Sequence, residues 1–237
     1  MSDSAPSFST AAYLLPHINR EGRRFGLPAL ALAVAVAVAS WWFGWLGWIV
    51  VPLFLLAYGV FMFFRDPDRF PPEDETAIVS PADGRICLVR ETELPDSLAE
   101  SDGGAKHWCV SVFMSVLDVH VNRMPTAGQI LRKEYVAAGK FLNASLDKAS
   151  KENERCNYLV KAGNGQTYGV TQIAGLVARR IVPQVEEGQL LSRAERFGLI
   201  RFGSRLDVYL PVGVRPEVRV GQTMVAGETV IGHLSRG

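Results

Sequence analysis

Two patterns of apolar residues divide the chain. From Phe25 to Phe64 there is no Asp, Glu, Lys or Arg, which makes 40 consecutive uncharged positions. From Ala77 onward, short alternating runs of apolar and polar residues are separated by Gly, Pro, Asn and Asp. The first pattern has room for two membrane crossings of about 20 residues each. The second pattern predicts a β-rich domain.

The middle of the uncharged run predicts the tip of a helical hairpin. Four of the five tryptophans lie there, interleaved with two glycines: Trp41, Trp42, Trp45, Trp48, Gly44 and Gly47. Tryptophan prefers the membrane interface, glycine permits a turn, and a helix satisfies its own backbone groups in lipid. One long tilted helix, or a shallow hairpin in the membrane plane, is the alternative, because each half is short for a full span.

Positive residues flank both ends of the run: Arg20, Arg23 and Arg24 before it, Arg65 and Arg69 after it. The positive-inside rule then predicts that both ends face the cytoplasm. A cleaved signal peptide is disfavoured, because the run begins late and is too long. We therefore expect an anchor in the inner cell membrane, with the following domain on its cytoplasmic side.

Composition shifts predict four segments. Residues 1–24 form a polar N-terminal segment, 25–64 the membrane hairpin, 65–76 a linker, and 77–237 the β-rich domain. The exit region Phe63–Thr76 holds three prolines and five acidic residues, which will not continue a helix.

Within residues 77–237 the alternation predicts strands at short spacing, which favours a mainly β sandwich or barrel-like domain. The predicted strands are 77–80, 84–90, 107–117, 128–137, 157–162, 166–173, 176–182, 199–202, 205–210 and 216–220, with a closing pair near 223–225 and 229–234. Residues 91–106 are interpreted as a surface loop, and 139–156 as a polar excursion that could cover a site.

The C-terminal stretch from Arg215 to Gly232 resembles the hairpins of lipoyl and biotinyl carrier domains. Those hairpins carry a modified lysine at their turn, and no lysine follows Lys161 in this chain. A carrier role is therefore disfavoured.

Charge and cysteine content exclude several classes. The net charge is +1 with scattered basic residues, so no nucleic-acid partner is expected. Cys87, Cys109 and Cys156 are too few and too dispersed for a disulfide framework or a zinc site, and we interpret them as reduced thiols. No metal cofactor is predicted.

The pair Gly203–Ser204 interrupts two strand-like runs and is the first candidate for chemistry. A glycine lets the backbone bend and places no Cβ beside the next hydroxyl. The structural alternative is a β-bulge with a solvent-facing serine.

Three further clusters hold reactive side chains. Asp83 lies in the turn Ser-Pro-Ala-Asp-Gly, where Asp commonly caps its own backbone. His120 follows an apolar run within Asp-Val-His-Val-Asn-Arg-Met-Pro, where a lone histidine is more often a structural hydrogen-bonding residue. Arg179 and Arg180 are adjacent cations that could face an anionic headgroup or form plain salt bridges.

Six motifs occur in order along the chain: Phe-Phe-Arg-Asp-Pro after the hairpin, Ser-Pro-Ala-Asp-Gly, Asp-Val-His-Val-Asn-Arg-Met-Pro, Asn-Glu-Arg at 153–155, Ile-Ala-Gly-Leu-Val-Ala-Arg-Arg, and Phe-Gly-Ser-Arg-Leu-Asp-Val-Tyr-Leu-Pro. In these motifs and their order the chain resembles the short, bacterial type of phosphatidylserine decarboxylase, and the resemblance covers residues 60 to 234. Six ordered motifs are far more specific than any single one.

The resemblance implies a self-processing proenzyme. Ser204 would attack the Gly203 carbonyl, and elimination would leave a covalent pyruvoyl group derived from Ser204. The products would be a β chain of residues 1–203 and an α chain of residues 204–237, which form a heterodimer. The pyruvoyl ketone would form a Schiff base with phosphatidylserine and serve as the electron sink for its decarboxylation to phosphatidylethanolamine in phospholipid biosynthesis.

By the same resemblance, Asp83 would orient the base that activates Ser204, and His120 would donate the proton to the substrate α-carbon. Longer family members have a second histidine, often assigned as the processing base, where this chain has Arg123. Either His120 serves both steps or another group supplies the base. Arg123 could instead face phosphate.

Other functions remain open from the residues alone. A close variant would act on another serine lipid, such as an archaeal-type ether lipid. A membrane-anchored hydrolase could use Asp83, His120 and Ser204 as a triad, although no Gly-x-Ser-x-Gly surrounds Ser204. A non-enzymatic carrier or scaffold is disfavoured by the missing lysine.

Overall fold

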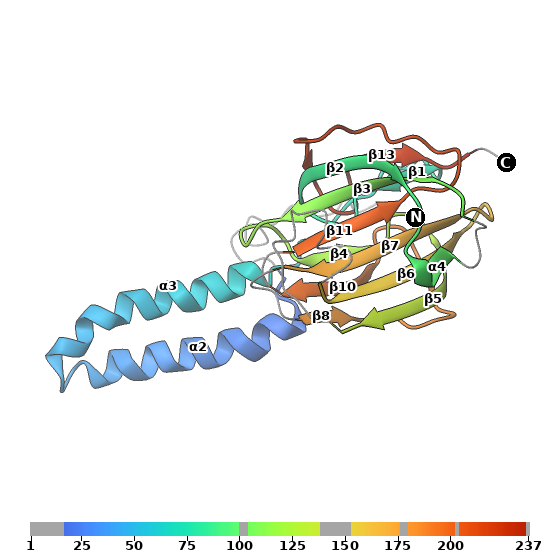
Figure 1. The fold of residues 1–237 in the computed structure, drawn as a ribbon. Helices are drawn as coiled ribbons and strands as arrows, with labels where there is room; N and C mark the ends of the chain where they lie inside the picture. Colours follow the sequence, from blue (N-terminus) through green and yellow to red (C-terminus); the bar gives the residue numbers. More distant parts are fainter. Residues whose placement is uncertain (1–16, 100–103, 138–152, 176–179, 202–203, 236–237) are drawn as a thin grey trace, which may run out of the picture. The chain divides into compact units, whose positions relative to one another are not determined.

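The computed structural model describes residues 17–99, 104–137, 153–175, 180–201 and 204–235 (Figure 1). The chain forms two compact units, one ending at Asp68 and one beginning at Arg69. The finer division into four segments remains a prediction.

The first unit is a hairpin of two helices. Helix α2 spans Arg20–Ala39, a single 3-10 turn, η1, spans Gly44–Leu46, and α3 spans Gly47–Phe63. Asn19 caps the start of α2, because its side-chain oxygen accepts a hydrogen bond from the Glu21 backbone nitrogen at 3.1 Å. The single long helix is therefore wrong. The turn falls at the predicted tryptophan-rich tip.

Both helical segments are long and apolar enough to cross a membrane. Arg20–Ala39 and Gly44–Phe63 each contain 20 residues, which corresponds to about 30 Å of helix. The tip is open to its surroundings, since Trp41 is 90% exposed and Trp48 is 87% exposed. Apolar side chains placed outward in this way suit lipid rather than water.

The second unit is mainly β, as the alternation predicts. Its strands are β1 (Ala77–Val79), β2 (Gly84–Thr92), β3 (His107–Met114), β4 (Val121–Arg123), β5 (Gly128–Val136), β6 (Arg155–Ala162), β7 (Thr167–Ala174), β8 (Arg180–Pro183), β9 (Leu190–Leu191), β10 (Arg196–Arg201), β11 (Ser204–Tyr209), β12 (Thr223–Met224) and β13 (Val230–His233). One short helix, α4 (Asp96–Ala99), follows β2. The expected fold class is confirmed.

The strands of the described residues form three sheets. An eight-stranded sheet has the order β12-β2-β3-β11-β7-β6-β5-β9, a three-stranded sheet the order β4-β10-β8, and β1 pairs with β13. Figure 1 shows β11 lying between β3 and β7. Strand β11 is antiparallel to both neighbours over all six of its residues. The two runs flanking Gly203–Ser204 thus belong to different sheets.

Several predicted boundaries were wrong. Residues 216–220 form no strand, because Pro216 lacks an N–H and only an isolated bond joins Glu217 to Ile231. The predicted pair near the C-terminus exists as β12 and β13, but these pair with β2 and β1. The short strands β4 and β9 were not predicted. Most of the 139–156 excursion lies outside the described residues.

The prediction of a loop over residues 91–106 was wrong in part, because β2 continues to Thr92 and α4 spans Asp96–Ala99. Leu94 and Leu98 are buried beside Tyr209, which explains why α4 folds onto the sheet. The larger core cluster lies on the other face of β11, around Leu206 and Val208. Alternate residues of β11 therefore face two different buried layers.

Candidate active site

Ser204 is the first residue of β11 and is fully buried. Its backbone lies opposite Met114 of β3 and Ala174 of β7. The alternative of a solvent-facing serine is therefore wrong. Gly203, the other half of the predicted cleavage site, lies outside the described residues.

The Ser204 hydroxyl contacts a sulfur atom. Its Oγ lies 3.9 Å from Met114 Sδ, and the Asn122 side-chain amide donates to the same sulfur at 3.6 Å. Both Met114 and Asn122 are shielded from solvent. Because a thioether only accepts hydrogen bonds, both contacts point a proton at sulfur.

His120 lies two residues before Asn122 and is 1% exposed. Its Nδ1 is 2.9 Å from the Asp118 carbonyl oxygen. Since a carbonyl can only accept, Nδ1 carries the proton in the neutral ring and Nε2 is the basic nitrogen. The Ile200 nitrogen donates to the His120 carbonyl at 3.4 Å, which ties this residue to β10.

Asp83 forms two charge-assisted hydrogen bonds. Its Oδ1 accepts from the Ala226 backbone nitrogen at 2.7 Å, and its Oδ2 accepts from Arg69 at 2.7 Å. The carboxylate therefore joins the start of the β unit to the turn after β12, and it does not cap its own turn. Its predicted role in orienting the base remains a prediction.

Gly84 brings the Asp83 turn against the end of β3. Its φ is +143°, and a Cβ there would lie 2.1 Å from the Phe113 carbonyl oxygen. Only glycine permits this approach. The same Cβ would lie 3.3 Å from the Met114 Cα, so the turn packs on the residue that pairs with Ser204.

The three predicted substrate-binding arginines have different surroundings. Arg123 is 5% exposed and donates to the Ala194 carbonyl oxygen at 3.0 Å. Arg180 begins β8 and is exposed, opposite Arg201 of β10. Arg179 lies outside the described residues. A role in binding phosphate remains a prediction for all three.

The three cysteines are free thiols. Burial raises the pKa of Cys156 to about 11 and raises that of Cys109 well above its usual range. Buried neutral thiols are poor nucleophiles. The described residues also contain no group of three or more His, Cys, Asp or Glu side chains that could hold a metal ion.

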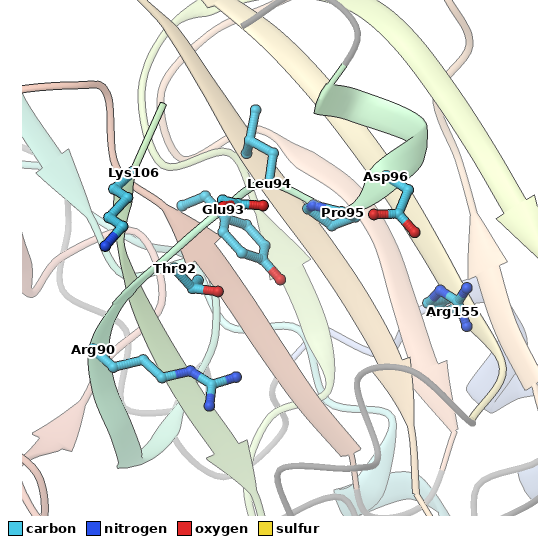
Figure 2. A pocket seen from close by; sticks show the side chains of 9 residues that line it. Arg90, Thr92, Glu93, Leu94, Pro95, Asp96, Lys106 and Arg155 are labelled. Atoms are coloured by element: carbon cyan, nitrogen blue, oxygen red, sulfur yellow. The ribbon is translucent and has the colours of Figure 1, made fainter. Parts of the chain in front are cut away.

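A pocket of about 490 Å³ lies at the opposite end of β11, where Tyr209 contributes to its lining. At about 3.3 Å per strand residue, Tyr209 is roughly 16 Å from Ser204. Figure 2 shows Arg90 and Lys106 on one side of the pocket, and Asp96 and Arg155 on the other. Its mixed charges are thus separate from the Ser204 site.

Two residues of the Ser204 site, Met114 and Asn122, were not predicted from the sequence. Asn122 lies two residues after His120 in the same motif, so that motif could have indicated it. Met114 carries no such signal. Its position beside Ser204 depends on the pairing of β3 with β11, strands 90 residues apart in sequence.

Comparison with known proteins gives consistent results. The sequence model for phosphatidylserine decarboxylase matches residues 57–232. A phosphatidylserine decarboxylase proenzyme of Erythrobacter litoralis is 52% identical, over 94% of this chain and 90% of its own length. Proteins of the same name from Novosphingobium aromaticivorans and Zymomonas mobilis are each 49% identical, over 95% and 92% of this chain and over 90% and 87% of their own lengths. The chain therefore belongs to the phosphatidylserine decarboxylase family and is a decarboxylase.

Proposed function

We propose that this protein converts phosphatidylserine to phosphatidylethanolamine, using a pyruvoyl group that it makes from its own Ser204. The observation that carries the proposal is the buried serine at the head of β11, in a chain whose relatives are named proenzymes. Family membership argues against the hydrolase, carrier and scaffold alternatives.

The proposed maturation begins with attack of Ser204 Oγ on the Gly203 carbonyl carbon. The new C–O bond replaces the C–N bond, giving an ester and a free Ser204 amine, while a base accepts the hydroxyl proton. Loss of the Ser204 α-proton then breaks the Cβ–O bond and releases Gly203 as a carboxylate. The dehydroalanine left behind tautomerises to an imine, and water replaces its nitrogen as ammonia, leaving a ketone.

The surroundings of Ser204 suit such a group. Its neighbours Met114 and Ala174 bring no charged side chain, and the residue is sealed from solvent. Exclusion of bulk water strengthens electrostatic interactions and limits side reactions. The pyruvoyl ketone supplies an electron sink for the electrons released when CO2 leaves.

His120 is proposed as the residue that returns a proton to the substrate α-carbon. The bond from Nδ1 to the Asp118 carbonyl orients the ring and leaves Nε2 to exchange protons. The Asp118 carboxylate in turn accepts hydrogen bonds at 2.8 Å from both the backbone nitrogen and the hydroxyl of Ser115. This loop therefore holds His120 in a defined position.

Cleavage before Ser204 would leave β11 in place. Its six residues are paired with β3 and β7, both of which precede the cut. The α chain of residues 204–237 would therefore stay bound to the β chain of residues 1–203 as a heterodimer. The helical hairpin would keep the enzyme at its lipid substrate, in the inner membrane with the catalytic unit on the cytoplasmic side.

Electrophoresis under denaturing conditions tests the proposal. The purified protein is expected to run as a large and a small fragment, the small one with a mass that fits an N-terminal pyruvoyl group. Ser204→Ala should stay intact and inactive, because alanine has no hydroxyl. Ser111→Ala is the matched control, since Ser111 is equally buried on the neighbouring strand β3. An intact wild-type chain in an active preparation would contradict the proposal.

A second variant tests the histidine. His120→Gln should lose decarboxylation of phosphatidylserine vesicles, measured as CO2 release. His107→Gln provides the control, because His107 is also 1% exposed and its Nδ1 also contacts a carbonyl, that of Leu210, at 2.7 Å. Full turnover by His120→Gln would show that another group delivers the proton.

A further inference from the structure

A series of buried side chains, joined by hydrogen bonds, ends at Ser204. The Tyr158 hydroxyl donates to Gln172 Oε1 at 2.9 Å, and Gln172 Nε2 donates to Asn122 Oδ1 at 2.8 Å. Asn122 Nδ2 then donates to Met114 Sδ at 3.6 Å, and that sulfur also accepts from Ser204 Oγ at 3.9 Å. We call Tyr158, Gln172, Asn122 and Met114 the amide chain.

The direction of every bond in the amide chain is fixed by its last member, because the Met114 sulfur can only accept. Asn122 therefore presents its NH2 group to the sulfur and its oxygen to Gln172. Gln172 must then donate its NH2 group to Asn122, and its oxygen accepts from the Tyr158 hydroxyl. Reversing either amide would place two donors or two acceptors against each other.

The amide chain is sealed from water. Tyr158 is 1% exposed, and Gln172, Asn122, Met114 and Ser204 are each 0% exposed. A buried polar group that loses its partner cannot turn to solvent for another, so a satisfied buried network holds one arrangement. The four side chains come from β6, β7, β4 and β3, and thus connect the three-stranded sheet to the eight-stranded sheet that contains β11.

The backbone makes room for this arrangement at one point. Gly198 of β10 lies opposite Asn122 of β4. A Cβ at Gly198 would lie 3.0 Å from Gln172 Nε2 and 2.9 Å from the Val182 carbonyl oxygen. A larger residue would therefore push on the amide that bonds to Asn122.

We infer that the amide chain fixes the side-chain rotamer of Ser204 and thereby sets the rate of self-cleavage before Ser204. The inference rests on the proposed function and makes Met114 and Asn122 positioning residues. Sulfur is a weak acceptor, so it orients the hydroxyl proton without competing strongly with the base that must remove it. A nucleophile misplaced by about 1 Å can lose about 100-fold in rate.

Met114→Leu is the sharpest test, because it keeps side-chain volume and removes the sulfur. Synthesis of the full chain in a cell-free system with vesicles, followed by electrophoresis over time, gives the rate of self-cleavage. We expect the rate to fall about ten-fold or more. Because the amide chain contributes no titrating group to the step, the fall should be the same at every pH from about 6 to 9.

Met224→Leu is the matched control. Met224 is 1% exposed in the same core cluster but lies on β12. The two variants should melt at similar temperatures, and only Met114→Leu should be cut slowly. A second matched pair is Tyr158→Phe against Tyr168→Phe, since the Tyr168 hydroxyl bonds instead to the Thr126 carbonyl at 3.2 Å. Tyr158→Phe should slow cleavage by about three-fold, and Tyr168→Phe should not.

The outcomes separate the inference from the proposed function. If wild-type protein is not cut, or if Ser204→Ala is cut, the proposed function fails. If wild-type protein is cut and Met114→Leu is cut as fast as Met224→Leu, the proposed function stands and the amide chain has no positioning role. Equal rates of self-cleavage for Tyr158→Phe and Tyr168→Phe would likewise show that the amide chain does not position Ser204.

Discussion

The helical hairpin exposes many apolar side chains, whereas the β unit buries most of its own. In the hairpin, Leu55 is 64% exposed and Val34 is 47% exposed, whereas Val112 and Val208 in the β unit are 0% exposed. A single solvent cannot favour both arrangements. The hairpin suits hydrocarbon and the β unit suits water.

The two regions also differ in their charged residues. The hairpin has no charged residue between Arg24 and Arg65. The β unit buries Arg205 and Asp207, each 1% exposed, and pairs them through bonds of 2.6 and 2.7 Å. These two buried charges in the β unit thus offset each other, and this unit is the region where the proposed chemistry takes place.

The largest expected effect comes from placing one carboxylate in each region. Val208→Asp should abolish folding of the β unit, because an unpaired buried charge costs several kcal/mol, against a typical total stability of about 5–15 kcal/mol. Leu55→Asp should leave thermal unfolding of the β unit unchanged and weaken membrane insertion by about 3 kcal/mol. Circular dichroism melts in detergent and alkaline washing of membranes measure the two effects. An equal loss of melting temperature in both variants would show that the two regions do not differ in this way.

The buried ion pair should give the next largest effect. Asp207→Asn strands the Arg205 charge and should cost about 3–5 kcal/mol in denaturant unfolding, while the double variant Arg205→Met, Asp207→Leu should recover at least half of the loss. Glu186→Gln is the exposed control, because Glu186 pairs with Lys133 at 2.8 Å but its side chain is 82% exposed. That change should cost under about 1 kcal/mol. Similar losses for Asp207→Asn and Glu186→Gln would show that burial does not strengthen the pair.

A smaller effect is expected from alkaline pH. Burial raises the folded-state pKa of Cys156 from 9.0 to about 11, so the folded state holds the thiol proton more tightly than the unfolded chain. The associated stability is complete below about pH 9 and is lost as pH rises through about 11, by up to roughly 3 kcal/mol. Cys156→Ala should flatten the curve of unfolding free energy against pH in this window. An unchanged slope would show that other groups cause the alkaline loss.

The sequence predicts the hairpin and most strands because both rest on local periodicity. The uncharged run and the tryptophan tip place the helices, and the alternation around Ser204 places β10 and β11. Local patterns do not predict the pairing of strands that are distant in sequence, and they miss strands of only two or three residues. Strand β4 has three residues and was missed, although it lies between His120 and the turn at Pro125.

The candidate site also combines residues that local motifs predict with contacts that only the fold creates. Motifs predict Ser204, His120 and Asp83 as site residues, but the contacts of Ser204 with Met114 and of Asp83 with Arg69 follow from the fold. The sequence suggested that Asp83 caps its own turn, whereas its bonds reach Arg69 and Ala226. Asp83 is 14 positions from Arg69 and 143 positions from Ala226. A periodic sequence pattern predicts local structure only and cannot predict such contacts.

The order of residues around Ser204 carries a consequence for biosynthesis. Met114, Asn122, Tyr158 and Gln172 all emerge from the ribosome before Ser204. If Ser204 cuts the chain as proposed, a nascent polypeptide stays whole at least until β11 has been made and can pair with β3 and β7. Each cleaved molecule would then have folded around Ser204 before cleavage. The ratio of cleaved to uncleaved protein in a cell extract would therefore measure the folding yield.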